Sequence, residues 1–277
     1  MVDKSLDSGT KALKIVRLRE GKSRKSQDVV VKERPVSIFL NDDHIATSMC
    51  TPNSLEYMAV GYLLTEGLIH GKSDVKSVVA DEKACGVWVE TSRKVKPPRN
   101  PEGPRLLTAG CGSSMVRAGK KIVTGQSKMN RRITISEDFI RTLVLEFQRR
   151  SVVYRLTGGV HGAALCDSEG IRVFNEDIGR HNAVDKVIGE CLLREISMRD
   201  KIMVTSGRIT SEMLAKVAIS GIPIIISKSA PTDLAVDLAI RQGVTLVGFV
   251  RGKRMNVYSN GQRIKKANRS ASPSFPR

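Results

Sequence analysis

The feature that most constrains the fold of this chain is a regular alternation of two kinds of segment after Ser136. Apolar, β-branched runs that lack a polar alternation are typical of strands covered on both faces. These runs are "IRVF", "IMVTS", "IPIIIS" and "VTLVGFV", and helix-like segments at 180–194, 210–220 and 232–242 lie between them. The alternation predicts a largely parallel sheet between helical layers, a three-layer α/β/α domain over 136–260.

A smaller α+β portion is predicted for residues 1–105. "VSIFL" and "HIATSM" read as a strand pair across a short turn, and "SVVA" and "CGVWVE" read as two further strands. The segment between these pairs predicts a helix with Thr51 as its N-cap, Pro52 in its first position and Gly67 at its end. The sequence therefore predicts two structured parts.

Two further segments are predicted to lack regular structure. Residues 106–135 are rich in Gly, Ser and Lys and have little periodicity, which favours a mobile basic loop. Residues 261–277 are basic, contain several Ser and Pro and are poor in large apolar side chains, which favours a disordered tail. The loop is of functional interest because it contains "TAGCGSSM", in which Cys111 stands between two glycines.

The cysteines indicate a reducing compartment. There are five, at positions 50, 85, 111, 166 and 191, with no Cys-x-x-Cys pair among them. An odd number at wide spacing argues against a disulfide framework and a zinc ribbon, so we expect a cytoplasmic protein without a protein-ligated metal. We also expect no membrane association, because no run approaches the ~18 apolar residues of a membrane span and the N-terminus lacks an apolar signal region.

Among these cysteines, Cys111 is the candidate nucleophile. The flanking glycines leave its sulfur accessible, and residues 92–132 hold eleven basic residues against one acid. A basic neighbourhood lowers the pKa of a thiol and favours the reactive thiolate. The other four cysteines stand in apolar or strand-like segments, which is the usual setting of a structural free cysteine.

Basic side chains follow four predicted strands. In an open α/β sheet, ligands bind beyond the carboxyl ends of the strands. Those ends supply Arg180, Arg208, Lys228, Arg251, Lys253 and Arg254. Helix starts at Thr210 and Thr232 would add backbone N–H groups and the positive end of a helix dipole. Any one such turn would be ordinary, but four on one edge predict a phosphate-binding face.

Two histidines belong to the same region of the predicted sheet. His161 stands in "GGVHGAAL", where the glycines indicate a tight turn or a close approach of the backbone. His181 begins a predicted helix near Glu176 and Asp177, and acidic neighbours can hold a histidine protonated or fix its tautomer. A packing role stays open for both histidines.

The net charge of +18 favours anionic partners such as nucleotides, phosphorylated cofactors, nucleic acid or an acidic protein. Nucleic acid is the weaker expectation, because the sequence has no recognisable binding motif and only 4% aromatic residues for base stacking. A basic nucleic-acid-binding protein therefore stays an alternative.

The chain resembles the FdhD family of formate dehydrogenase accessory sulfurtransferases. The resemblance covers roughly residues 37–258 and is carried, in family order, by "GGVHGAAL", "EDIGRHNAVDKVIG", "TSGRITSEMLAK", "SKSAPTDLAVDLA" and "GFVRG". It implies a cytoplasmic carrier that takes sulfur from a cysteine desulfurase as a persulfide and passes it to Mo-bis-molybdopterin guanine dinucleotide, the cofactor that formate dehydrogenase needs for activity. It also implies a cytidine-deaminase-like fold, although the zinc-binding signature of the deaminases is missing.

The resemblance also assigns roles to individual residues. It implies that Cys111 carries the persulfide and that the segment 249–254 binds the phosphates or the guanine of the cofactor. The predicted cofactor site therefore comprises Phe249, Val250, Arg251, Gly252, Lys253, Arg254, Arg208, Lys228, Arg180, His181 and His161.

One departure from the family pattern is Ser114, which stands where family members commonly carry a second cysteine. A single thiolate suffices for a persulfide, so the carrier role is retained on Cys111, whereas a relay between two thiols is not. A cofactor-binding chaperone without sulfur transfer is therefore an alternative. Expected partners are a cysteine desulfurase and formate dehydrogenase or another molybdoenzyme, and the sequence leaves a homodimer open.

Overall fold

The structure is a computed structural model that describes residues 9–93, 95, 105–107 and 133–266. Cys111 and most of the predicted loop 106–135 lie outside the described residues, as does the last part of the predicted tail. None of the helices in the described ranges is long and apolar enough to cross a membrane.

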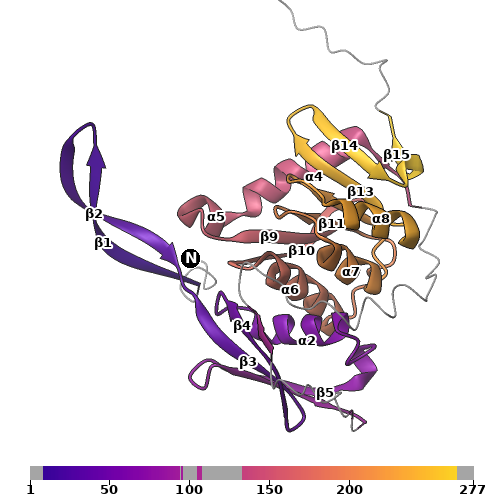
Figure 1. Cartoon of the computed structure of the whole chain (residues 1–277), viewed down its shortest axis with the longest axis horizontal. Helices are drawn as coiled ribbons and strands as arrows, with labels where there is room; N and C mark the ends of the chain where they lie inside the picture. Colours follow the sequence, from indigo (N-terminus) through magenta and orange to yellow (C-terminus); the bar gives the residue numbers. More distant parts are fainter. Residues whose placement is uncertain (1–8, 94, 96–104, 108–132, 267–277) are drawn as a thin grey trace, which may run out of the picture.

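The N-terminal part consists of a projecting hairpin and a five-stranded sheet with one helix (Figure 1). The hairpin is formed by β1 (Thr10–Arg19) and β2 (Lys22–Val31). The sheet has the order β5-β6-β3-β4-β7. Its strands are β3 (Arg34–Leu40), β4 (Asp43–Cys50), β5 (Val75–Asp81), β6 (Gly86–Thr91) and β7 (Arg105–Leu107), with helix α2 (Leu55–Thr65) and the 3₁₀ turn η1 (Lys72–Asp74).

The two predicted strand pairs are confirmed as β3–β4 and β5–β6, both antiparallel. The predicted start of the following helix is wrong, because α2 begins at Leu55 with Ser54 as its N-cap. Thr51 has tertiary partners instead. Its N–H donates to Asp177 Oδ2 at 3.1 Å, and its hydroxyl accepts from the Ile178 N–H at 3.2 Å. These bonds fix the end of β4 to the C-terminal part.

The C-terminal part contains a six-stranded sheet of order β10-β9-β11-β12-β13-β14. Its strands are β9 (His161–Asp167), β10 (Gly170–Asp177), β11 (Ile202–Thr205), β12 (Ile224–Ser227), β13 (Thr245–Arg251) and β14 (Arg254–Ser259). Its helices are α4 (Glu137–Arg150), α5 (Val152–Thr157), α6 (Arg180–Leu193), α7 (Ser211–Ile219) and α8 (Asp233–Gln242).

This sheet is mixed rather than largely parallel, which corrects the prediction. Only β11–β12 and β12–β13 pair in parallel, because short turns join β9 to β10 and β13 to β14 as hairpins. Strand β9 is antiparallel to both of its neighbours, so β10 runs in the same direction as β11. The carboxyl ends of β10, β11, β12 and β13 therefore meet at one edge, as the sequence predicts.

Helices cover both faces of the sheet. Ile140, Leu143 and Phe147 of α4 pack on one face in a buried cluster with side chains of β9, β11, β12 and β13. On the other face, α6, α7 and α8 share a buried core with α2 and the N-terminal sheet. The sheet is therefore the middle of three layers, and the apolar core continues through α2 into the N-terminal part (Figure 1).

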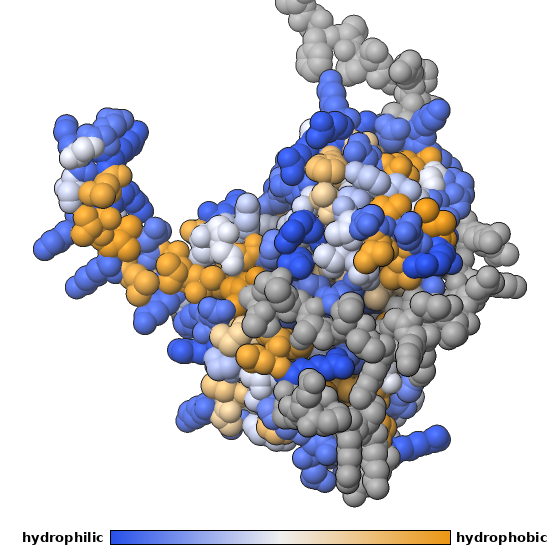
Figure 2. Space-filling model, in the orientation of Figure 1, coloured by the Kyte–Doolittle hydropathy of each residue, from blue (hydrophilic) through white to orange (hydrophobic). Residues whose placement is uncertain are grey.

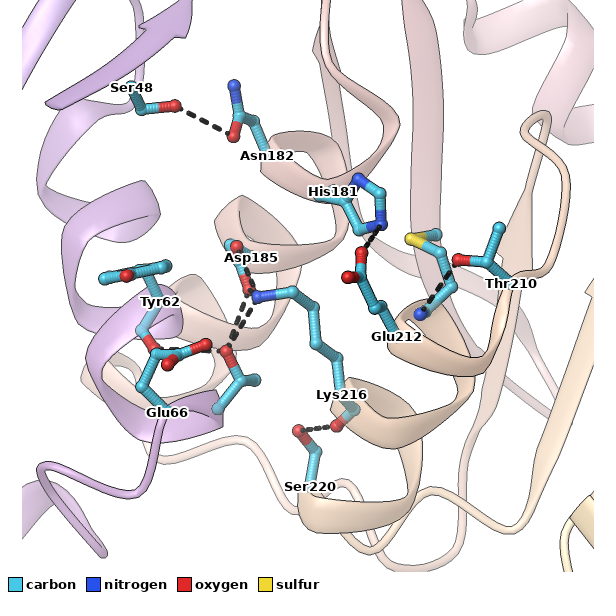
Figure 3. A network of polar contacts seen from close by, with 12 residues as sticks. Ser48, Tyr62, Glu66, His181, Asn182, Asp185, Thr210, Glu212, Lys216 and Ser220 are labelled. Atoms are coloured by element: carbon cyan, nitrogen blue, oxygen red, sulfur yellow. Dashed lines mark hydrogen bonds and ion pairs between the residues drawn. The ribbon is translucent and has the colours of Figure 1, made fainter. Parts of the chain in front are cut away.

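A buried ion pair joins three of these helices (Figure 3). Lys216 Nζ of α7 lies 2.9 Å from both carboxylate oxygens of Asp185 on α6, and 2.9 Å from the hydroxyl of Thr65 on α2. Breaking such a pair leaves a charge in the protein interior, which costs about 3–5 kcal/mol. The pair therefore fixes α6 relative to α2 and α7.

Residues 261–265, at the start of the predicted tail, have regular secondary structure. The 3₁₀ turn η2 (Gly261–Arg263) leads into β15 (Ile264–Lys265), which pairs with β8 (Ile135–Ser136). Arg263 is buried, and its guanidinium donates to the Gly243 carbonyl and the Thr245 hydroxyl at 2.9 Å each. The predicted disorder is therefore wrong for 261–265, because the arginine finds partners that composition does not reveal.

Candidate functional site

A cavity of about 800 Å³ opens at the edge where the strand ends meet. Its lining residues are Arg141, Val144, Leu145, Phe147, Gln148, Ser151, Tyr154, Arg155, His161, Gly162, Ser206, Lys228, Ser229, Val250, Arg251 and Gly252. A volume of this size suits a small-molecule site. Five members of the predicted site line it together: His161, Lys228, Val250, Arg251 and Gly252.

Hydrogen bonds join the start of β9 to the end of β11 and the turn after it, beside the cavity. Ser206 Oγ accepts from the Gly162 N–H at 3.1 Å and lies 3.2 Å from His161 Nδ1. The Thr205 hydroxyl donates to the Gly162 carbonyl and accepts from the Gly207 N–H, at 3.2 Å each. His161 is therefore held by a defined set of hydrogen bonds at the wall of the cavity.

Lys228 and Arg251 bring two positive charges to this wall. Arg251 Nε donates to the backbone carbonyl of Lys228 at 3.1 Å, which fixes the Arg251 side chain against the Lys228 backbone. Burial, and then the charge of Arg251, lower the pKa of Lys228. Among the described residues, no carboxylate lies within ion-pair distance of either side chain. An anionic ligand in the cavity would supply the missing negative charge.

The segment 249–254 is the tip of the β13–β14 hairpin. Gly252 has a φ of 55° in the two-residue turn, a conformation that favours glycine. The guanidinium carbons of Arg251 and Arg254 lie 5.8 Å and 5.9 Å from the centre of the Phe249 ring, a cation–π arrangement. Lys253 is exposed in the turn, whereas the Val250 side chain is buried in the core.

Arg180, Arg208 and His181 lie near the cavity but do not line it. Burial is the largest cause that lowers the pKa of His161, and the positive charges of Arg180 and Arg208 lower it further. The two arginines therefore act on the cavity through their charge. His181 Nε2 lies 3.3 Å from Glu212 Oε2 of α7 (Figure 3), although this approach lacks the angle of a hydrogen bond.

The acidic residues that the sequence associates with His181 have other partners. Glu176 accepts from the N–H groups of Val153 and Tyr154 at 3.0 Å and 2.9 Å, and so caps α5. Asp177 lies 2.6 Å from Lys186 Nζ, and both side chains are fully buried.

The helix starts predicted at Thr210 and Thr232 are present but lie outside the cavity lining. Thr210 and Thr232 are the N-caps of α7 and α8, but their hydroxyls accept from the Met213 and Ala235 N–H groups of their own helices at 3.4 Å each. Neither threonine lines the cavity. Sequence reasoning also missed one wall, formed by Arg141 and Gln148 of α4 and by Tyr154 and Arg155 of α5.

The described cysteines fall into two groups. Cys50, Cys166 and Cys191 are buried, and burial raises the pKa of Cys50 and Cys191 to about 12 and that of Cys166 still higher. A thiol so protonated is a poor nucleophile at neutral pH. Cys85 is half-buried in the β5–β6 turn with a φ of 50°, so it is not the packed strand residue that the sequence suggests.

We predict that His161 titrates below the 6.5 of an ordinary imidazole, because burial and two arginines disfavour its cation. A bound anion would offset the positive charge of the two arginines. Binding of GDP, whose guanine and phosphates are also part of the predicted cofactor, should therefore raise the midpoint of the His161 titration. Proton NMR of the four histidines over a pH series measures both values, and His161→Gln assigns the resonance. A midpoint at or above 6.5 in the free protein would contradict the expectation.

Comparison with known proteins assigns most of the chain to one family. The model of the FdhD/NarQ family matches residues 31–265. "Sulfur carrier protein FdhD" of Bacillus pumilus is 39% identical over 89% of this chain and 94% of its own, and that of Bacillus subtilis is 37% identical over 94% and 99%.

A solved structure agrees with these matches. The crystal structure of a putative formate dehydrogenase accessory protein from Desulfotalea psychrophila is 31% identical, with a TM-score of 0.78 over 92% of this chain and 99% of that one. Agreement in sequence and in fold over most of the length leads to one assignment: the chain belongs to the FdhD/NarQ family.

Proposed function

We propose that this protein is a cytoplasmic sulfur carrier that loads sulfur on Cys111 and passes it to a molybdenum cofactor, Mo-bis-molybdopterin guanine dinucleotide, bound as a substrate in the cavity. The relatives named sulfur carrier protein, and the solved relative named formate dehydrogenase accessory protein, support the carrier role. The finer kinship of the C-terminal part with cytidine deaminases stays a prediction.

The observation that carries the proposal is the pair of Lys228 and Arg251 without a carboxylate partner among the described residues, at the wall of an 800 Å³ cavity. Cations without a counter-charge favour phosphate groups. Val144, Phe147 and Tyr154 give the cavity an apolar wall as well. A dinucleotide with a fused-ring pterin has both phosphates and flat, weakly polar surfaces, so the residues present fit such a ligand.

The loading step needs one accessible thiolate. The Cys111 thiolate would attack the terminal sulfur of a cysteine desulfurase persulfide, whose S–S bond breaks as the desulfurase cysteine leaves as a thiolate. Cys50, Cys166 and Cys191 are buried with raised pKa values, which disfavours the same attack from them. Of the two remaining cysteines, Cys85 and Cys111, we assign the persulfide to Cys111, which stands between two glycines in the basic segment 92–132.

We predict that Arg251→Ala weakens GDP binding by about tenfold or more, because a hydrogen bond to a charged group contributes about 1.5–3 kcal/mol. GDP represents the guanine and phosphate part of the cofactor. Isothermal titration at low salt measures the affinity. Arg19→Ala is the matched control, since Arg19 is exposed at the tip of the β1–β2 hairpin. Equal GDP affinity in Arg251→Ala and the unaltered protein would remove the segment 249–254 from the proposed site.

A cofactor-binding chaperone is the second candidate, and Ser114 is the observation that favours it. The motif "CGSS" has no second thiol. It therefore cannot relay sulfur between two cysteines of its own or protect Cys111 in an internal disulfide. A chaperone would keep its effect on a molybdoenzyme when Cys111 is replaced, whereas a carrier would lose it. The same replacement therefore separates the two candidates.

A further inference from the structure

The hairpin of β1 and β2, which we name the arm (residues 10–31), projects from the body (Figure 1). Its strands pair only with each other among the described sheets, so backbone groups on both outer edges are open to a partner. Val16 and Leu18 are 59% and 75% exposed, and apolar side chains extend along the arm toward its base (Figure 2). Because a lone two-stranded hairpin is marginal in water, a partner that covers this surface would stabilise it.

The charge of the arm restricts what can cover it. Residues 10–31 contain seven basic and two acidic residues, a net charge of +5. The two acids, Glu20 and Asp28, lie 3.8 Å and 3.7 Å from Arg19 and Arg17, so the remaining five cations have no carboxylate within ion-pair distance among the described residues. A second copy of this chain, with its own charge of +18, is a poor electrostatic match.

Nucleic acid fits the arm less well than an acidic protein does. The arm has no aromatic side chain on which a base could stack. Its exposed leucine and valine side chains would gain nothing from a phosphate backbone, whereas they suit the apolar centre of a protein interface. Positive charge beside exposed apolar side chains therefore points to an acidic protein surface with apolar side chains of its own.

The position of the arm links it to the cavity. Helix α5 lies against β2, and Gly159, just after α5, approaches the Val31 side chain so closely that a Cβ there would lie 2.9 Å from it. Tyr154 of α5 is half-exposed and lines the cavity, and Leu156 on the same helix is also half-exposed. Exposed apolar side chains of α5 therefore lie between the cavity and the base of the arm.

We propose that the arm docks the acidic surface of the enzyme that receives the cofactor. This inference rests on the function proposed above, because a cofactor held in the cavity must leave toward a protein that approaches from outside. A carrier and a chaperone both need such an acceptor beside the cavity.

The test uses the double variant Val16→Asp with Leu18→Asp, which places acid on the basic arm at two exposed sites. The matched control is Leu234→Asp with Ile240→Asp on α8, since both of these side chains are exposed and neither lines the cavity. Each full-length protein is assayed for GDP affinity, for sulfur loading by a cysteine desulfurase, and for binding and activation of cofactor-free formate dehydrogenase.

We expect the arm variant to bind GDP and load sulfur normally but to bind the acceptor about tenfold more weakly or worse, the effect of losing interface anchors. Activation should slow in parallel, the α8 variant should match the unaltered protein, and added salt should weaken the unaltered complex. Unchanged acceptor binding by the arm variant would overturn the proposal. So would lost sulfur loading, a changed oligomeric mass in size-exclusion chromatography or lost RNA binding in a filter assay, which assign the arm to the desulfurase, to a second copy of this chain or to nucleic acid.

The assays also separate this proposal from the one on which it rests. An unaltered protein that neither binds GDP nor loads sulfur refutes the proposed function whatever the arm does. If the unaltered protein does both and the arm variant still binds the acceptor, only the proposal for the arm is refuted.

Discussion

Replacing Gly189 by alanine should destabilise the protein by about 3 kcal/mol, the upper end of what overpacking usually costs. A Cβ on Gly189 of α6 would lie 1.9 Å from the Tyr57 carbonyl oxygen and 2.7 Å from the Gly61 nitrogen of α2. Both atoms are backbone, so no side chain can rotate away and the helices must separate. Gly61→Ala should act in the same way, because its Cβ would lie 1.9 Å from the backbone carbonyl oxygen of Asp185.

Urea denaturation followed by circular dichroism measures this effect as a lower midpoint at an unchanged slope. Gly71→Ala is the matched control, because it adds the same methyl group in extended backbone, where the nearest atom would be 3.9 Å away. Similar midpoints for Gly189→Ala and Gly71→Ala would contradict the close helix crossing. A lower midpoint for Gly189→Ala alone would support it, and would show that the N-terminal part is built onto α6.

The sequence predicts the elements near the site well because their signals are local. Helices α6, α7 and α8 lie in the helix-like segments predicted at 180–194, 210–220 and 232–242, between the apolar strand runs. The sequence also predicts the common edge of the four strand ends. A helix joins each of these strands to the next, so the strands run in the same direction.

The remaining features depend on long-range packing that a sequence does not display. The antiparallel course of β9 requires knowing that a short turn returns β10 beside it. The part of the cavity wall that α5 forms depends on Glu176, a residue of β10 that caps α5. Residues 10–31 belong to the predicted α+β portion, but no strand is predicted among them, because charges interrupt the alternation along both strands of the hairpin. The need for glycine at positions 61 and 189 is likewise not visible in the sequence, because it arises only where α2 crosses α6.

Replacing Cys111 by alanine should reduce the activation of formate dehydrogenase to the level found without this protein, because the variant has no thiolate to carry sulfur. The measurement is the activity of formate dehydrogenase matured in cells that supply each variant. Cys85→Ala is the matched control, since Cys85 is the one cysteine among the described residues that is not buried. Full activation by Cys111→Ala would favour the chaperone, and loss in Cys85→Ala alone would transfer the carrier role to that residue.

The most direct measurement of the central claim is the intact mass of the protein after incubation with a cysteine desulfurase and cysteine. We expect one added sulfur atom per chain, removed by reductant, present in Cys85→Ala and absent from Cys111→Ala. No added sulfur on the unaltered protein, or equal loading of the Cys111→Ala protein, would contradict it.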